Sequence, residues 1–231
     1  MFSQGLFTNI CPAQAGGIME NRQVFPLVCL SRLRMATDGQ GITTLAVGAG
    51  CPLRCQYCIN AYAWKENCRF TSVNSQGLYD LIKRDDLYFQ ATEGGITFGG
   101  GEPLLHAAFI REFRMLCEGK WRITAETSLN VPELYQQIAL ECVDEFIVDI
   151  KDMDPEIYFR YTGAQNTAVK EGLKLLIRTL GSERVLVRVP HIPGFNTADN
   201  VARSIEQLHE LGVKRIDEFT YICPPDALGS V

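Results

Sequence analysis

With 231 residues, 46% of them hydrophobic, the chain is long enough to bury one sizeable core, and a single domain is expected. A net charge of −5 argues against a nucleic-acid-binding protein, because such proteins usually carry basic stripes. The sequence has no run of about 18 apolar residues and no signal peptide, so neither a membrane span nor export is expected.

The nine cysteines are distributed unevenly. Cys51, Cys55 and Cys58 lie within eight positions, and the other six stand singly at positions 11, 29, 68, 117, 142 and 223. An odd number of cysteines with one tight cluster does not fit a disulfide framework. It is more typical of metal binding or catalysis in a reducing compartment, so we expect a cytoplasmic protein.

Residues 1–40 show little periodicity and are expected to form an irregular N-terminal extension before a core domain over residues 41–231. Beyond residue 41, short apolar runs alternate with segments of helical periodicity. The predicted strands are 42–48, 95–100, 121–127, 145–151, 184–190 and 213–222. The predicted helices are 72–84, which begins at Ser72 as the N-cap, and 103–119, 131–141, 166–181 and 196–212.

This alternation predicts an α/β fold with a parallel sheet of right-handed β-α-β units. Both an open sheet with helices on its two faces and an incomplete or full barrel fit the pattern. In either case the chemistry belongs at the C-terminal ends of the strands. Polar or glycine-rich clusters follow five of the six strands, which favours a site at that edge.

The three clustered cysteines have the spacing C-x3-C-x2-C, and none of the three histidines lies near them. A structural zinc site and an electron-transfer iron–sulfur cluster both use four ligands. Three thiolates would leave one iron of a 4Fe–4S cluster open to bind a substrate or cofactor. The alternative is a zinc site completed by Cys68 or by a more distant cysteine.

This cysteine run, with Tyr57 just before the third cysteine, resembles the signature of the radical S-adenosylmethionine (radical SAM) enzymes. The resemblance implies a 4Fe–4S cluster on Cys51, Cys55 and Cys58, with S-adenosylmethionine bound to the open iron. It also implies a 5′-deoxyadenosyl radical that abstracts hydrogen from the substrate. The implied fold is a partial (β/α)6 TIM-like barrel, which agrees with the six predicted strands.

The run TFGGGEPLLH resembles the family's GGE motif, so Gly100, Gly101 and Glu102 are expected to hold the amino group of the cofactor. Glycines permit close approach of the backbone to a ligand, and the glutamate adds an acceptor. Without the cysteines the motif would be weak evidence, because Gly-Gly turns are common.

The ends of the next two strands resemble one subset of the family, the glycyl-radical-enzyme activating enzymes. In that subset a D-x-K motif, here Asp149 to Lys151, contributes a lysine that contacts the cofactor. An acidic residue, a threonine and the motif's aspartate surround a monovalent cation there. Glu126, Thr127 and Asp149 match these positions, although Glu126 stands where aspartate is usual.

The run RVPHIPGFN resembles the strand-five segment of the same enzymes. It implies that Arg188 neutralises a carboxylate or a charge beside the ribose, and that Ile192 and Tyr57 border the adenine. The resemblance extends from the DGQGI run at residue 38 to Tyr221. The chain lacks the ferredoxin-like insert of many activating enzymes and the usual Tyr-His pair, with Cys223 near the position of the histidine.

The expected function is therefore abstraction of hydrogen from a backbone glycine of a partner glycyl radical enzyme, with electrons from a flavodoxin- or ferredoxin-type donor. The alternatives within the family are an enzyme that acts on a small molecule, as the 7-carboxy-7-deazaguanine synthases do, or on a peptide. Outside the family, the alternative is a non-catalytic metal-binding or redox-sensing module. The sequence does not predict an oligomeric state.

Overall fold

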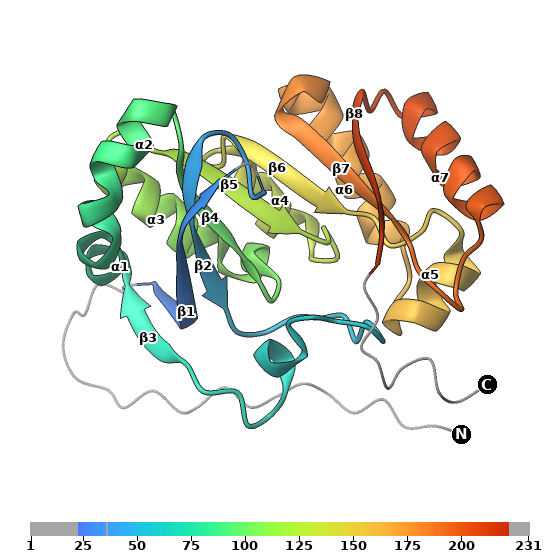
Figure 1. Cartoon of the computed structure of the whole chain (residues 1–231), viewed down its shortest axis with the longest axis horizontal. Coiled ribbons are helices and arrows are strands. Elements are labelled where there is room, and N and C mark those ends of the chain that lie inside the picture. The colour runs from blue at the N-terminus through green and yellow to red at the C-terminus, as the bar shows by residue number, and fades with distance from the viewer. Residues whose placement is uncertain (1–22, 36, 222–231) are drawn as a thin grey trace.

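The computed structural model describes residues 23–35 and 37–221, which form an α/β fold around one sheet. Its strands are β1 (Val24–Met35), β2 (Ile42–Gly48), β3 (Thr71–Asn74), β4 (Gly95–Gly100), β5 (Arg122–Thr127), β6 (Glu145–Asp149), β7 (Val185–His191) and β8 (Arg215–Thr220). The order across the sheet is β3-β1-β2-β4-β5-β6-β7-β8, so the described strands leave it open between β3 and β8. Figure 1 shows this sheet curving between its two edges, with helices around its outside.

Six neighbouring strands, β2 and β4 to β8, run parallel to one another. Each matches a predicted strand to within two residues at either end. The central strands read as apolar runs because parallel strands are covered on both faces, and β4 and β6 are almost entirely buried. The open, parallel-rich sheet confirms the prediction of a partial barrel.

The described part of the N-terminal segment is not irregular. Val24–Met35 form the long strand β1, which pairs antiparallel with β2 on one side and β3 on the other. The prediction of an irregular segment is therefore wrong for these residues. Two register shifts interrupt the alternation of side chains along β1, and Leu33 has a positive φ of 55°. Because of these irregularities, the sequence of β1 lacks the regular alternation that predicts a strand. The domain boundary at residue 40 stays a prediction.

The helices are α1 (Ser75–Ile82), α2 (Asp86–Thr92), α3 (Ala107–Cys117), α4 (Glu133–Leu140), α5 (Pro155–Thr162), α6 (Thr167–Leu180) and α7 (Ala198–Glu210). Short 3-10 turns are η1 (Ala61–Trp64), η2 (Lys83–Asp85), η3 (Pro103–His106) and η4 (Ser182–Arg184). The predictions missed α2 and α5. Helix α5 carries the N-cap Asp154 and the left-handed Gly163 after its end, but it is too short to show helical periodicity.

The predicted N-cap of the first helix lies two residues too early. Ser72 lies in β3, opposite Pro26 of β1. The observed N-cap is Asn74, whose side chain accepts a hydrogen bond from the Gly77 backbone N–H at 2.7 Å. Serine and asparagine are about equally good caps, so the pairing of β3 with β1 decides where the helix starts.

Aromatic side chains fill the core between the sheet and α3. Phe98 of β4 contacts Phe25 of β1 and both Phe109 and Phe113 of α3, with ring centroids 5.5 to 6.3 Å apart. All four rings are buried. These edge-to-face contacts join β1 to the parallel strands, so the antiparallel strand belongs to the same core.

A buried carboxylate links β1, β2 and η2. Asp85 is fully buried and accepts hydrogen bonds from Arg32 Nε at 2.9 Å and from Thr44 Oγ1 at 2.9 Å. Burial alone would raise the pKa of Asp85, but the hydrogen bonds from Arg32 and Thr44 outweigh it and hold that pKa below its usual value. The carboxylate therefore stabilises the fold in its ionised form.

Replacing Asp85 by asparagine is expected to lower the free energy of unfolding at pH 7 by about 2 kcal/mol, because hydrogen bonds to an ionised partner are lost. A lowered carboxyl pKa contributes stability above the unfolded-state value, and this contribution disappears as the pH falls through the folded-state value. The difference between wild type and Asp85→Asn should thus be full at pH 7 and shrink below about pH 4.

Urea denaturation at several pH values measures this difference. Asp80→Asn is the matched control, since Asp80 pairs with Lys83 on the exposed face of α1 and should contribute little. A difference between wild type and Asp85→Asn that stays constant down to pH 3 would contradict the assignment.

The parallel strands bring their C-terminal ends to one edge of the sheet. The segment after β2 leaves this edge, runs toward α5 and returns through η1 to β3 (Figure 1). Among the described residues, no helix combines the length and apolar character needed to cross a membrane.

Candidate active site

The three clustered cysteines lie on the segment between β2 and η1, here called the cysteine loop (residues 49–60). The loop is attached to α5, because the Arg54 and Gln56 N–H groups donate to the carbonyls of Thr162 and Tyr161 at 2.8 and 3.1 Å. Its start is attached to η1 by a bond from Gly50 N–H to the Ala63 carbonyl at 2.8 Å. These bonds fix the backbone on both sides of Cys55.

Cys51, Cys55 and Cys58 are free thiols, and all three are half-buried. Burial raises the pKa of Cys51 to about 12 and also raises that of Cys55. Both thiols are therefore neutral near pH 7 and have to lose their protons to become metal ligands, which a bound cation favours. In the described part of the chain, no three Cys, His, Asp or Glu side chains converge on a position for a single metal ion.

The glycine loop after β4 is fastened directly to the cysteine loop. Gly101 N–H donates to the Gly48 carbonyl at 3.0 Å, and Glu102 N–H donates to the Gly50 carbonyl at 2.7 Å. Gly100 has a φ of 89°, and a Cβ atom on Gly101 would overlap the Gly50 carbonyl oxygen. The glycines are thus needed for the close approach of two backbones, as well as for any approach to a ligand.

Glu102 is almost completely buried and ties this loop to the end of β5. Its carboxylate accepts hydrogen bonds from Thr127 Oγ1 at 2.6 Å, from Ser128 Oγ and N at 2.7 and 2.9 Å, and from Leu104 N at 3.1 Å. Burial raises the pKa of Glu102, while these bonds act in the opposite direction. Thr127 was predicted beside the monovalent cation, and here its hydroxyl orients Glu102. Ser128 was not predicted.

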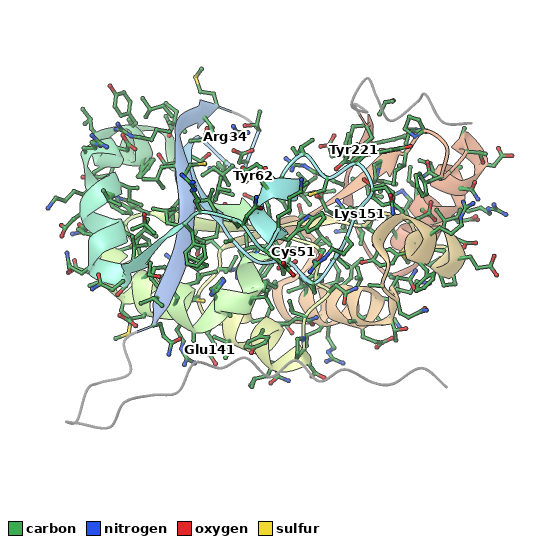
Figure 2. The ribbon with its side chains drawn as sticks, turned by 90° about the horizontal axis from the view of Figure 1, so that it is seen from below. Arg34, Cys51, Tyr62, Glu141, Lys151 and Tyr221 are labelled. Atoms are coloured by element: carbon green, nitrogen blue, oxygen red, sulfur yellow. The ribbon has the colours of Figure 1, made fainter. Side chains whose placement is uncertain are left out.

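Lys151 is buried at the end of β6, and its Nζ donates to Asp149 Oδ2 at 3.0 Å. Burial by itself would lower the pKa of Lys151, but the negative charge of Asp149 and interactions with Cys55 raise it well above its usual value. Lys151 is therefore a permanent buried cation beside the cysteine loop. In Figure 2 the labelled Cys51 and Lys151 lie near the middle of the molecule, with Tyr221 near Lys151.

The predicted cation ligand Glu126 lies next to Arg188 of β7. Arg188 Nη1 donates to Glu126 Oε1 at 2.8 Å, and the guanidinium also faces Asp217 of β8 at 3.6 Å. Arg188 therefore neutralises a carboxylate, as predicted, and the carboxylate that it pairs with here is the side chain of Glu126. Burial and Asp149 raise the pKa of Glu126, whereas Arg188 opposes them. The monovalent cation stays a prediction.

Of the two residues predicted to border the adenine, Tyr57 contacts the segment that follows the other, Ile192. Tyr57 packs edge-to-face on Phe195 with centroids 5.5 Å apart, in the segment that follows Ile192. Ile192 is buried, and its N–H donates to Asn196 Oδ1 at 2.6 Å. Asn196 Nδ2 in turn donates to the buried Asp152 at 3.1 Å. Sequence reasoning did not single out Asn196 or Asp152, which join the segments after β6 and β7.

A cavity of about 450 Å3 opens beside the cysteine loop at this edge of the sheet. Its apolar wall comes from Ile59, Phe219 and Tyr221, and its charged wall from Asp149 and Arg188. A hollow of about 520 Å3 shares Thr37, Arg188 and Asp217 with this cavity, whereas one of about 600 Å3 around Trp121 contains none of the predicted site residues. Of the predicted site residues, Asp149 and Arg188 line the cavity beside the cysteine loop.

A family model of the radical SAM superfamily matches residues 45–203. The match covers more than half of the chain, from within β2 into the first half of α7, and includes the cysteine loop and the glycine loop. The chain belongs to the radical SAM superfamily. Membership implies a 4Fe–4S cluster and S-adenosylmethionine.

Curated relatives of the chain are activating enzymes. The (2S)-3-sulfopropanediol dehydratase activating enzyme of Klebsiella oxytoca is 29% identical over 247 residues, which covers 77% of this chain and 75% of the relative. The pyruvate formate-lyase-activating enzyme of Listeria monocytogenes is 29% identical over 196 residues, which covers 80% of this chain and 77% of the relative. The 4-hydroxyphenylacetate decarboxylase activating enzyme of Clostridioides difficile is 28% identical over 237 residues, which covers 75% of this chain and 74% of the relative.

Solved structures support the fold. SuiB of Streptococcus suis bound to the precursor peptide SuiA superposes with a TM-score of 0.60 at 12% identity, which covers 77% of this chain. Native anSMEcpe with bound AdoMet gives 0.56 at 20% identity, which covers 76% of this chain. The chain spans only 38% of the SuiB chain and 50% of the anSMEcpe chain, so these likenesses concern the shared sheet and helices.

Proposed function

We propose that this protein is a radical SAM activating enzyme that removes a hydrogen atom from a backbone glycine of a partner glycyl radical enzyme. The observation that carries the proposal is the attachment of a loop with three free, half-buried thiols to both the glycine loop and α5, at the C-terminal ends of the parallel strands. The relatives that activate dehydratases, lyases and decarboxylases support a protein substrate.

The residues present fit the two cofactors. Three soft thiolates suit iron, and the glycine loop brings exposed backbone next to them. In the proposal Cys51, Cys55 and Cys58 hold the 4Fe–4S cluster. When bound, the reduced cluster and S-adenosylmethionine supply the carbon-centred radical. The cofactor contacts are Tyr57, Gly100, Gly101, Glu102, Thr127, Lys151, Arg188 and Ile192.

In the proposal, side chains around the cavity determine where the hydrogen atom is removed from the substrate. Lys151 and Asp149 form a charged pair beside the cysteine loop, and Ile59, Phe219 and Tyr221 give the adjoining cavity an apolar wall. The apolar wall limits water around the reacting atoms. A cavity of about 450 Å3 accepts a short extended segment but no folded domain, so a loop of the partner has to enter it.

Three finer points belong to the same proposal. A flavodoxin- or ferredoxin-type protein supplies the electrons, and a reducing cytoplasm keeps the thiols and cluster intact. A monovalent cation binds between Glu126 and Asp149, because hard oxygen ligands gather there. Arg188 occupies one oxygen of Glu126, so the cation would use the other.

The test is anaerobic. The protein is loaded with iron and sulfide, reduced with dithionite and given S-adenosylmethionine with a short peptide whose central glycine carries deuterium at the α carbon. Mass spectrometry of the 5′-deoxyadenosine product should show transferred deuterium. Product without deuterium would favour a small-molecule substrate, and a protein with about one zinc and no sulfide would favour the metal-binding module.

A further inference from the structure

The turn between the first two cysteines of the cysteine loop is held by the side chain of Arg54. Its Nη1 donates to the Cys51 carbonyl at 2.6 Å and to the Leu53 carbonyl at 2.8 Å. Among the described residues, no backbone N–H donates to either of these carbonyls. Leu53 is buried in the core, so the turn is anchored by this apolar side chain as well as by the guanidinium. Arg54 therefore fixes the backbone that separates Cys51 from Cys55.

Arg54 also connects this turn to two other elements. Its backbone N–H donates to the Thr162 carbonyl at the end of α5 at 2.8 Å. Its guanidinium lies over the Trp64 ring of η1, with Cζ 4.8 Å from the ring centroid, which is within the range of a cation–π interaction. A planar guanidinium bonds to carbonyls and stacks on an aromatic face at the same time, which a lysine ammonium does less well. The residue thus joins the turn, η1 and α5 in one arrangement.

The positive charge of Arg54 lies close to the first of the proposed cluster ligands. The carbonyl oxygen and the sulfur of Cys51 belong to one residue, so the guanidinium is within about 7 Å of that sulfur. No carboxylate of the described residues forms an ion pair with Arg54, so its charge is not neutralised there. A cluster becomes more negative when it is reduced, and a nearby positive charge favours the reduced state.

We propose that Arg54 is a positioning residue for the iron–sulfur cluster, which sets the spacing of the first two ligands by holding the Cys51 and Leu53 carbonyls. The inference rests on the proposed function, which places the cluster on the three cysteines. A turn that is formed before iron binds loses less chain entropy on binding, so the cluster is held more tightly. The charge of Arg54 in addition makes the bound cluster easier to reduce.

The test compares Arg54→Gln with wild type, each as the full chain loaded with iron and sulfide. The variant is expected to lose its iron to a chelator about tenfold faster, since partners outside the ligand set contribute about 10–100-fold to metal affinity. At a fixed potential it should hold about threefold less reduced cluster, which is the effect of a unit charge about 7 Å away in water. Absorbance of the chelator complex and a redox titration followed by electron paramagnetic resonance measure the two effects.

Arg54→Lys separates the two roles of the side chain. A lysine restores the charge, so the reduced fraction should return to the wild-type value. Its ammonium lacks the planar shape of the guanidinium, so iron release should stay faster than in wild type. Iron release at the wild-type rate in Arg54→Gln, or a reduced fraction that lysine does not restore, would overturn the assignment.

Arg160→Gln is the matched control. Arg160 of α5 is also exposed, donates to the Phe195 carbonyl at 2.8 Å and lies over the Phe195 ring, with Cζ 5.9 Å from the centroid. Neither contact involves the cysteine loop, so iron release and the reduced fraction should match wild type. Equally fast iron release from Arg160→Gln and Arg54→Gln would show a general effect of surface charge and would contradict the proposal.

Urea denaturation of the metal-free proteins tests whether the effect is local. Arg54 is exposed, so Arg54→Gln should unfold at nearly the same urea concentration as wild type. A large loss of stability would mean that the iron release reports unfolding of the chain, and the assignment would fail.

The failure of this inference is distinguishable from failure of the proposed function. If wild type assembles no cluster, the proposed function fails and the assignment fails with it. If wild type assembles a cluster and Arg54→Gln retains iron as wild type does, the proposed function stands and only the assignment of Arg54 fails.

Discussion

Cys55→Ala is expected to abolish cluster assembly and cleavage of S-adenosylmethionine. Cys55 is the central ligand of the proposed set, and the backbone on both sides of it is fixed to α5. Loss of a partner outside the ligand set already costs about 10–100-fold in metal affinity or activity, so loss of a ligand should cost more than about a hundredfold. Iron and sulfide content and the yield of 5′-deoxyadenosine measure the effect.

Cys68→Ala is the matched control, since Cys68 is a free, half-buried thiol on the segment between η1 and β3. It should load iron and sulfide as wild type does. Retention of about one zinc by wild type, with loss of that zinc in Cys68→Ala, would support instead the four-ligand zinc site that the sequence left open.

Gly101→Ala is expected to lower the free energy of unfolding by about 3 kcal/mol, because the new methyl group overlaps the Gly50 carbonyl oxygen and neither backbone has room to move apart without loss of hydrogen bonds. It should also weaken S-adenosylmethionine binding at least about tenfold, since a displaced glycine loop moves Glu102. Urea denaturation of the metal-free protein and calorimetric titration of the loaded protein measure the two effects.

Gly119→Ala is the control for Gly101→Ala, because it replaces a glycine of positive φ without steric overlap. A Cβ atom at Gly119 would meet nothing within 4 Å, but its φ of 74° is in the left-handed region. The substitution should therefore cost only about 1 kcal/mol and leave cofactor binding unchanged. Equal losses of stability in the two variants would argue against a tight junction between the glycine loop and the cysteine loop.

The sequence predicted the features that depend on local pattern. The central parallel strands are apolar runs between turn signals, and all six parallel strands appear in the structure within two residues of their predicted ends. The cysteine spacing and the glycine run are contiguous motifs, so they could be located without a fold. The superfamily match over residues 45–203 confirms the family that these motifs indicated.

The features that were missed depend on contacts between distant segments. Strand β1 is interrupted by register shifts, so its identity follows from pairing with β2 and β3. Helix α5 has eight residues and no motif of its own, and its role appears only where its carbonyls accept hydrogen bonds from the cysteine loop. Arg188 was expected to balance a ligand or ribose-side charge, and only the structure shows Glu126 beside it.

The attachment of the cysteine loop to α5 has a consequence for the order of assembly. Arg54 and Thr162 are more than a hundred positions apart, and contacts between such distant residues must overcome a large loss of chain entropy. The spacing of the three sulfurs is therefore set only after the second half of the chain has folded. Iron that arrives earlier meets thiols on a loose segment, so we expect the cluster to enter a finished fold and not to nucleate it.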